Sequence, residues 1–303
     1  MSIYLPIAGL SVDVYTLLVL GCGVGFLSGL FGVGGGFLLT PFLMFMGIPP
    51  AVAVATGANQ VVGASMSGLI AHWRRKNVDL RMGTVLLVGG VAGSSVGVFL
   101  FGWLKNLGQI DLVIALSYVF FLGFIGLTMG WESLSTIRKG ASSVIPRKRH
   151  RHPWPSLPLK MRFPRSGLYI SVLMPLSVGT FGGVLSAIMG VGGGFVMVPL
   201  MIYVLEMPTT VVVGTSLFQI IFVTANITLL QAVHTQTVDA VLMLTLLMGG
   251  VVGAQMGARF GARLRAEQLR LLLAVIVLLV CLRLGMDLVL TPGDTYSLQE
   301  HLQ

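Results

Sequence analysis

The chain has 303 residues, of which 55% are hydrophobic and only 10% are charged, and its mean hydropathy is +0.93. A soluble domain carries about 25% charged residues because its surface must face water. The composition therefore excludes a cytosolic enzyme, a disordered chain and a secreted disulfide scaffold. It predicts a polytopic α-helical membrane protein.

Ten apolar segments follow one another along the chain. They cover approximately residues 14–31, 36–48, 52–72, 82–102, 111–131, 168–189, 194–206, 210–232, 239–260 and 269–290. Eight of them have about 18–23 residues, enough to cross a hydrocarbon core of about 30 Å at about 1.5 Å per residue. The segments 36–48 and 194–206 are shorter, and each follows a glycine cluster and contains a proline, which is typical of half-helices or re-entrant hairpins. We therefore expect an all-α membrane bundle of about 8–10 segments.

The two halves of the chain repeat each other. The motif GVGGGF begins at Gly32 and recurs from Gly190, an offset of 158 residues. Further along the chain, Asp79 and Asp239 match at an offset of 160. Because the offset changes by only two residues, the pattern indicates an internal duplication and not matches that arise by chance from the composition.

The basic residues alternate between equivalent loops of the two halves. Seventeen of the 19 Lys and Arg residues lie in the stretches 74–81, 138–165 and 259–270, whereas 233–239, the counterpart of 73–81, has none. Cytoplasmic loops carry an excess of Lys and Arg, so this alternation predicts two inverted-topology repeats with both termini outside. The same clustering in loops argues against a nucleic-acid partner, despite the net charge of +9.

The predicted organisation has three parts. Residues 1–131 form the first transmembrane repeat, 132–167 a basic cytoplasmic linker and 168–303 the second repeat. Prolines in the linker prevent regular structure, which favours a flexible connection. Attraction of this segment to anionic lipid is the alternative.

The glycine clusters are the first candidates for a binding site. No Gly-Lys-Ser/Thr follows them and no strand precedes them, so nucleotide binding is not expected. Glycine accepts positive φ and lets a helix break, and the half-helix that follows would point its N–H groups and positive dipole end at an anion. The alternative is that the glycines serve only close helix packing. The candidate residues are Gly34, Gly35, Gly36, Gly192, Gly193 and Gly194.

Uncharged polar residues of the third segment in each half are the second candidates. In a dry site such side chains hold an oxyanion by hydrogen bonds without burial of a cation. Residues four apart, such as Thr56 and Gln60, share one helix face. Hydrogen bonding between helices, worth about 0.6 kcal/mol for each bond, is the alternative role. The polar residues of these segments are Thr56, Asn59, Gln60, Ser65 and Ser67 in the first half and Thr215, Ser216, Gln219, Thr224 and Asn226 in the second. The candidates chosen from them are Thr56, Asn59, Gln60, Thr215, Ser216 and Gln219.

Acidic residues are absent from the middle of every apolar segment. Intramembrane carboxylates usually mark proton or cation pathways, so their absence favours an anionic or neutral substrate. It leaves ion coupling open, with protons as the candidate coupling ion. Cys22 and Cys281 lie alone in apolar runs, and no catalytic or metal-binding motif occurs, so we expect no enzyme activity, no metal and no cofactor.

Several of these motifs together resemble the sulfite exporter TauE/SafE family. They are GLFGVGGG at 29–36, MGVGGG at 189–194, VVGTS at 212–216 and the Val-Asp pairs at 78–79 and 238–239. The resemblance implies export of sulfur-containing anions, such as sulfite or organosulfonates from taurine or sulfoacetate breakdown, across a bacterial inner membrane. Family members are described with about eight segments, which would make the two short ones re-entrant or half-length.

The sequence and the resemblance together predict a secondary transporter. It would export a small anionic sulfur compound by alternating access, as a multi-pass protein of the inner membrane with the lipid bilayer as its surroundings. A passive anion channel and an importer of sulfur oxyanions are the alternatives, and a membrane enzyme or assembly subunit is a third. Which sulfur anion is carried and the oligomeric state stay open.

Overall fold

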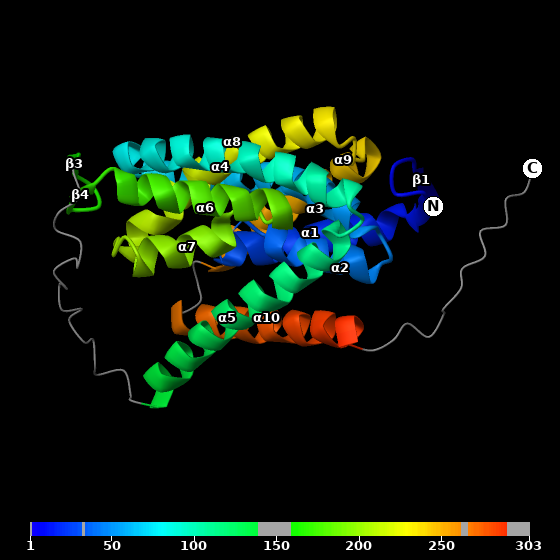
Figure 1. The fold of residues 1–303 in the computed structure, drawn as a ribbon. Coiled ribbons are helices and arrows are strands. Elements are labelled where there is room, and N and C mark those ends of the chain that lie inside the picture. Colours follow the sequence, from blue (N-terminus) through cyan, green and yellow to red (C-terminus); the bar gives the residue numbers. More distant parts are fainter. Residues whose placement is uncertain (1, 32–33, 139–158, 262–265, 290–303) are drawn as a thin grey trace, which may run out of the picture.

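The computed structural model describes residues 2–31, 34–138, 159–261 and 266–289. These residues form four short strands and ten helices (Figure 1). The strands are β1 (Ser2–Leu5), β2 (Leu10–Asp13), β3 (Lys160–Phe163) and β4 (Leu168–Ser171). The helices are α1 (Val14–Phe31), α2 (Gly36–Phe45), α3 (Pro50–Arg74), α4 (Leu80–Asn106), α5 (Ile110–Arg138), α6 (Leu173–Met189), α7 (Gly194–Tyr203), α8 (Thr209–His234), α9 (Ala240–Gly261) and α10 (Ala266–Val289).

The predicted polytopic helical bundle is confirmed. Among the described residues, six helices are both long and apolar enough to cross a membrane, namely α1, α4, α5, α8, α9 and α10. Two further segments that we expected to cross the membrane, 52–72 and 168–189, are not among these six helices. Helix α3 has 25 residues but is the least apolar of the ten described helices, and α6 has 17. The short segments are the ten-residue helices α2 and α7, each with one proline inside.

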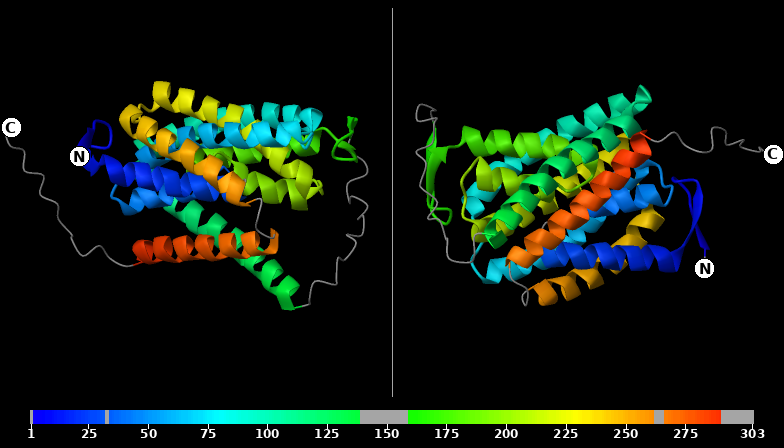
Figure 2. Two further views of the ribbon diagram at one scale, coloured as in Figure 1. Left: turned by 180° about the vertical axis from the view of Figure 1, so that it is seen from behind. Right: turned by 90° about the horizontal axis from the view of Figure 1, so that it is seen from below.

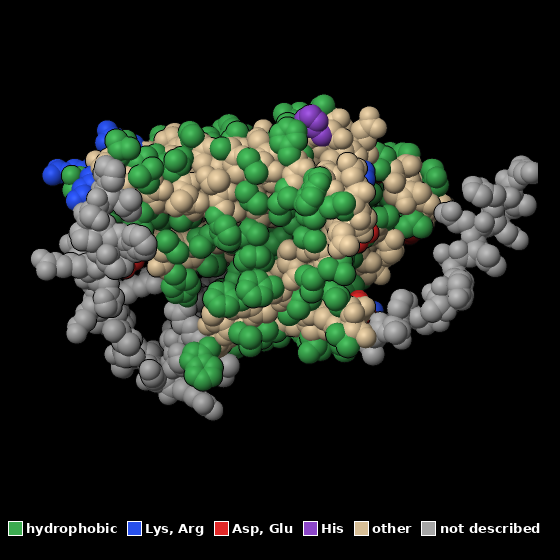
Figure 3. All heavy atoms as spheres, viewed as in Figure 1, with side chains coloured by type: hydrophobic (Ala, Val, Ile, Leu, Met, Phe, Trp, Pro, Cys, Tyr) green, Lys and Arg blue, Asp and Glu red, His purple; other side chains and the backbone are tan. Residues whose placement is uncertain are grey.

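The surface of the bundle is apolar between two polar ends. Large hydrophobic side chains such as Val19, Phe120 and Trp131 are more than half exposed. Figure 3 shows hydrophobic side chains across the bundle, with Lys and Arg gathered at the end that carries β3 and β4. An apolar belt of this kind matches a protein surrounded by lipid.

One antiparallel hairpin precedes the first helix of each half, and the sequence analysis predicted neither of them. Strand β1 pairs with β2, and β3 pairs with β4. Each turn ends on a glycine with positive φ, Gly9 at 69° and Gly167 at 65°. The repeated pattern Pro-x-x-Gly-Leu, from Pro6 and from Pro164, is a turn signal that would have located both. The hairpins lie at opposite ends of the bundle (Figures 1 and 2).

The region expected to be a linker contains regular structure at both ends. Helix α5 continues to Arg138, and β3 begins at Lys160. The central part of that linker, residues 139–158, lies outside the described residues, as do Gly32 and Val33 of the first glycine motif.

Stripes of glycine join the two halves of the chain. On α1, a methyl group at Gly25 would lie 2.3 Å from the carbonyl oxygen of Gly250 on α9. On α4, a methyl group at Gly93 would lie 2.0 Å from the carbonyl oxygen of Thr180 on α6. The stripes have a spacing of four residues, which keeps each on one helix face and lets the backbones approach closely. The first half therefore packs mainly on the second. The members are Gly21, Gly25 and Gly29 on α1, Gly249, Gly253 and Gly257 on α9, Gly89, Gly93 and Gly97 on α4, and Gly179 and Gly183 on α6.

Candidate functional site

Both glycine motifs break the helix, as the sequence predicts. Helix α1 ends at Phe31 and α2 begins at Gly36, and α6 ends at Met189 and α7 begins at Gly194. The connecting glycines are in the left-handed region that favours glycine. Their φ angles are 91° at Gly34, 64° at Gly35, 71° at Gly192 and 78° at Gly193. Gly35 and Gly193 are the N-cap residues of α2 and α7.

The tips of the two broken helices touch in the interior. A methyl group at Gly36 would lie 3.0 Å from the carbonyl oxygen of Val191 and 3.1 Å from that of Gly190. The rings of Phe37 and Phe195, the second residues of α2 and α7, stack with centroids 4.5 Å apart. All these residues are buried. The structure thus brings the two glycine motifs into contact from opposite halves of the chain, at Gly36 and at residues 190–191.

The predicted threonines bind the opposite half of the protein. The Thr56 hydroxyl accepts a hydrogen bond from the backbone N–H of Asp239 at 3.1 Å. The Thr215 hydroxyl accepts the equivalent bond from Asp79 at 3.0 Å. Both hydroxyls therefore hold the start of a helix, α9 or α4, which matches the alternative role of hydrogen bonding between helices.

The predicted glutamines lie against the glycine stripes. Gln60 donates from Nε2 to the carbonyl oxygen of Gly21 at 2.9 Å, and a methyl group at Gly250 would lie 2.4 Å from the same nitrogen. Gln219 lies against Gly90 in the same way, with its Nε2 2.8 Å from a methyl group placed there. The buried Oε1 of Gln219 has no hydrogen-bond partner among the described residues.

The last two predicted residues differ from each other. Ser216 donates to the carbonyl oxygen of Val213, one turn earlier in α8, at 3.0 Å. The Nδ2 of Asn59 is buried and finds no partner within the described part of the chain. Asn59 and Gln219 are therefore the predicted polar residues with unused hydrogen-bonding capacity.

Four hydroxyl residues lie beside the glycine tips, and the sequence analysis missed two of them, Ser28 and Ser186. A methyl group at Gly35 would lie 2.9 Å from the Ser28 hydroxyl, and one at Gly193 would lie 3.6 Å from that of Ser186. Ser28 and Ser186 differ by 158, the offset of the glycine motif itself, and this signal would have found them. The other two, Ser65 near Gly34 and Thr224 near Gly192, come from α3 and α8.

Two buried aspartates hold the ends of the bundle. Asp79 accepts at Oδ2 from the N–H and the hydroxyl of Ser166, at 2.9 and 2.7 Å, and at Oδ1 from the N–H of Met82 at 3.2 Å. Asp239 accepts at Oδ2 from the N–H of Ile7 at 3.0 Å. Each aspartate therefore caps a helix and anchors one hairpin, β3–β4 for Asp79 and β1–β2 for Asp239.

These aspartates are expected to stabilise the fold strongly. Asp79→Ala and Asp239→Ala each remove an N-cap and leave hairpin N–H groups unpaired, which costs about 2–4 kcal/mol. The measurement is the midpoint of thermal unfolding of the protein in detergent. Asp287→Ala is the control, because Asp287 is 53% exposed in a 3.9 Å ion pair with Arg283 and should change stability by less than about 0.5 kcal/mol. Equal midpoints in all three variants would contradict the role.

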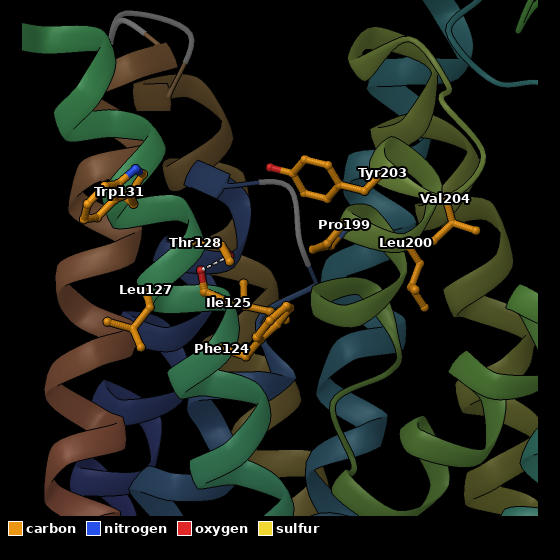
Figure 4. A pocket seen from close by; sticks show the side chains of 9 residues that line it. All are labelled: Phe124, Ile125, Leu127, Thr128, Trp131, Pro199, Leu200, Tyr203 and Val204. Carbon is orange, nitrogen blue, oxygen red and sulfur yellow. Dashed lines mark hydrogen bonds between the residues drawn. The ribbon is translucent and has the colours of Figure 1, made fainter. Parts of the chain in front are cut away.

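Among the described residues, two of the cavities open at the outside of the bundle. The larger, of about 820 Å³, opens between α5 and α7 and is lined by residues such as Phe124, Trp131, Pro199 and Tyr203 (Figure 4). The smaller, of about 350 Å³, is lined by the ends of α2 and α10 and the start of α5, including Asp111 and Asp287. The first is too apolar and the second too acidic to suit an anion. Neither is lined by a predicted site residue.

The fold and the paired helix breaks define a class of protein, namely a multi-pass membrane transporter. The chain matches the family described as "Sulfite exporter TauE/SafE" over residues 17–284. The match covers most of the chain, so the protein belongs to the TauE/SafE family.

Relatives from distant organisms are named only as membrane transporters. The chain is 26% identical to "Probable membrane transporter protein YjnA" of Bacillus subtilis over 89% of this chain and 98% of the relative. It is 29% identical to a "Probable membrane transporter protein" of Xylella fastidiosa strain 9a5c, over 75% and 77% of the two chains. It is 26% identical to "Probable membrane transporter protein MJ0441" of Methanocaldococcus jannaschii, over 61% of this chain and 60% of the relative. No solved structure matches the chain.

Proposed function

We propose that the protein is a secondary transporter that moves small sulfur-containing anions, such as sulfite or organosulfonates, by alternating access. The observation that carries the proposal is the meeting of the N-termini of α2 and α7 in the interior. A helix N-terminus carries about half a positive charge and orphan N–H groups, so two of them attract an anion without a buried Lys or Arg. The sulfur chemistry of the substrate rests on the family description.

The proposed mechanism needs two repeats of inverted topology. Three features support this arrangement. The hairpins of the two halves lie at opposite ends of the bundle (Figures 1 and 2). The glycine stripe of α1 packs on that of α9, and the stripe of α4 packs on that of α6. Because α6 is the equivalent of α1 and α9 is the equivalent of α4, the two contacts are equivalent under exchange of the halves. Thr56 and Thr215 make the same bond to the opposite half. Related halves of this kind can exchange conformations, which opens the site to one side and then to the other.

The orientation of the protein in the membrane follows from its charges. Basic residues lie at the end of α3 (Arg74), at the start of α4 (Arg81) and in β3 (Lys160 and Arg162). These elements meet at the end of the bundle where Figure 3 shows Lys and Arg gathered. We propose that this end faces the cytoplasm of a bacterial cell, across its inner membrane. The β1–β2 hairpin and the C-terminal end of α10 lie at the other end of the bundle (Figures 1 and 2), which under this proposal faces outward.

The proposal is tested with purified protein in lipid vesicles loaded with sulfite. We expect saturable sulfite release that competes with organosulfonates and is faster when sulfite is also present outside. Flux that rises linearly with voltage and does not saturate would instead identify a passive channel. Repeating the measurement with an imposed pH gradient tests protons as the coupling ion, and vesicles without protein are the control. Absence of sulfite and organosulfonate flux would contradict the proposed substrate class.

A further inference from the structure

The two helix tips each lie beside a buried hydroxyl that has nothing to bind. Ser65 on α3 is 0% exposed, and Ser186 on α6 is 1% exposed. Neither hydroxyl oxygen has a hydrogen-bond partner among the described residues. A buried polar group without a partner costs free energy, so such a group calls for a ligand or another compensation.

Both hydroxyls are next to the residues that start the half-helices. The Ser65 oxygen would be 3.5 Å from a methyl group on Gly34, which precedes the N-cap of α2. The Ser186 oxygen would be 3.6 Å from a methyl group on Gly193, the N-cap of α7. Each unpaired donor therefore adjoins the positive end of a ten-residue helix. The two tips are themselves in contact, through Gly36 and residues 190–191.

We infer that Ser65 and Ser186 are the hydroxyl donors of the anion site, and that together with the N-termini of α2 and α7 they bind an oxyanion with several acceptor oxygens. The inference rests on the proposed function. It names Ser186, which the sequence analysis did not consider, and Ser65, which it noted among the polar residues of its segment but did not choose. One donor comes from each half of the chain, and an oxyanion with two or more oxygens offers an acceptor to each. Sulfite and sulfonate groups have this chemistry.

The surroundings of the two hydroxyls strengthen such bonds. A methyl group at Gly192 would lie 2.4 Å from a Val61 side-chain carbon, and Val61 also packs on Gly34 and Gly36. This side chain gives the region a dry apolar wall, and hydrogen bonds to a charged group are stronger where water is excluded. Thr224, the counterpart of Ser65, already donates to the carbonyl oxygen of Ile220 at 2.6 Å. Ser65 is thus the member of that pair with a free donor.

Serine-to-alanine variants test the inference by binding and by stability together. Sulfite binding to purified protein is measured by titration calorimetry for the wild type, Ser65→Ala and Ser186→Ala. Loss of a hydrogen bond to a charged ligand should weaken binding by about 10- to 100-fold in each variant. Without sulfite, the unfolding midpoint should stay the same or rise, because an unpaired hydroxyl is removed from the interior. A merely structural role predicts the opposite, a lower midpoint.

Matched variants separate the hydroxyl from the side-chain volume. Ser65→Thr keeps a hydroxyl and should bind sulfite more tightly than Ser65→Ala. Ser177→Ala removes an exposed hydroxyl on α6 that bonds within its own helix, to Met174, and should bind like the wild type. Chloride, which offers no set of oxygens, should compete weakly.

The outcomes distinguish the inference from the proposed function. If the wild type binds sulfite and both alanine variants bind it as tightly, the role of Ser65 and Ser186 is wrong while the proposed function stands. If the wild type binds neither sulfite nor an organosulfonate, the proposed function fails and the inference fails with it.

Discussion

Alanine at Gly25 is expected to prevent assembly of the bundle, whereas alanine at Gly23, two residues away on the same helix, is expected to be harmless. The new methyl group at Gly25 would lie 2.3 Å from the Gly250 carbonyl oxygen, which is a backbone atom that no side-chain rotation can move. Helices α1 and α9 would have to separate along their whole glycine stripe. We expect a cost of more than about 3 kcal/mol, which is a large share of the stability of a typical protein.

Gly23 is the matched control for this substitution. A methyl group there meets nothing within 4 Å. Replacement of a helical glycine by alanine should then raise stability by about 0.5–1 kcal/mol through helix propensity. The measurement is the yield of monodisperse protein on size-exclusion chromatography, with its unfolding midpoint. Equal yields and midpoints for Gly25→Ala and Gly23→Ala would mean that the α1–α9 contact does not hold the halves together.

Valine at the helix tips is expected to abolish transport while the protein still inserts. Gly34 and Gly193 have φ angles of 91° and 78°, which a β-branched residue rarely adopts. In Gly193→Val the nearest atoms of Ser186 and Met197 lie 3.5 and 3.6 Å from the new methyl position, so strain at the tip outweighs crowding. The start of α7 should then shift away from α2, and the anion site is lost. Sulfite flux in vesicles is the measurement.

Gly47→Val separates general backbone strain from an effect at the tips. Gly47 has a φ of 83°, like the tip glycines, but it lies in the α2–α3 connection with nothing within 4 Å of a new methyl group. We expect this variant to lose stability and keep transport. If Gly34→Val and Gly193→Val both transported sulfite at the wild-type rate, the proposed role of the helix breaks would be wrong.

The candidate site was only partly visible in the sequence. The glycine motifs were found because the break depends on local backbone freedom, and that freedom is a property of the residue itself. Thr56 and Thr215 were chosen because a hydroxyl can bind an oxyanion, and Ser65 and Ser186 carry the same group. In the structure each threonine hydroxyl already binds a backbone N–H, whereas the two serine hydroxyls have no partner among the described residues. Whether a hydroxyl is occupied depends on its neighbours from the other half of the chain. Residue type and spacing carry no information about those neighbours.

Composition, segment length and the internal duplication determined the class of this protein. Little charge and apolar segments of membrane length leave the bilayer as the only solvent that fits. The free energy of transfer from water into the bilayer is a sum over the residues of a segment, so it can be judged without knowledge of which residues they contact. Tertiary structure alone decided the pairing of α1 with α9 and of α4 with α6, the anchoring of the hairpins by Asp79 and Asp239, and the contact of the two helix tips. Each of these depends on contacts between residues that lie far apart in the sequence. A stripe of glycine says which face can be approached, but shape and hydrogen bonding in three dimensions select the helix that approaches it.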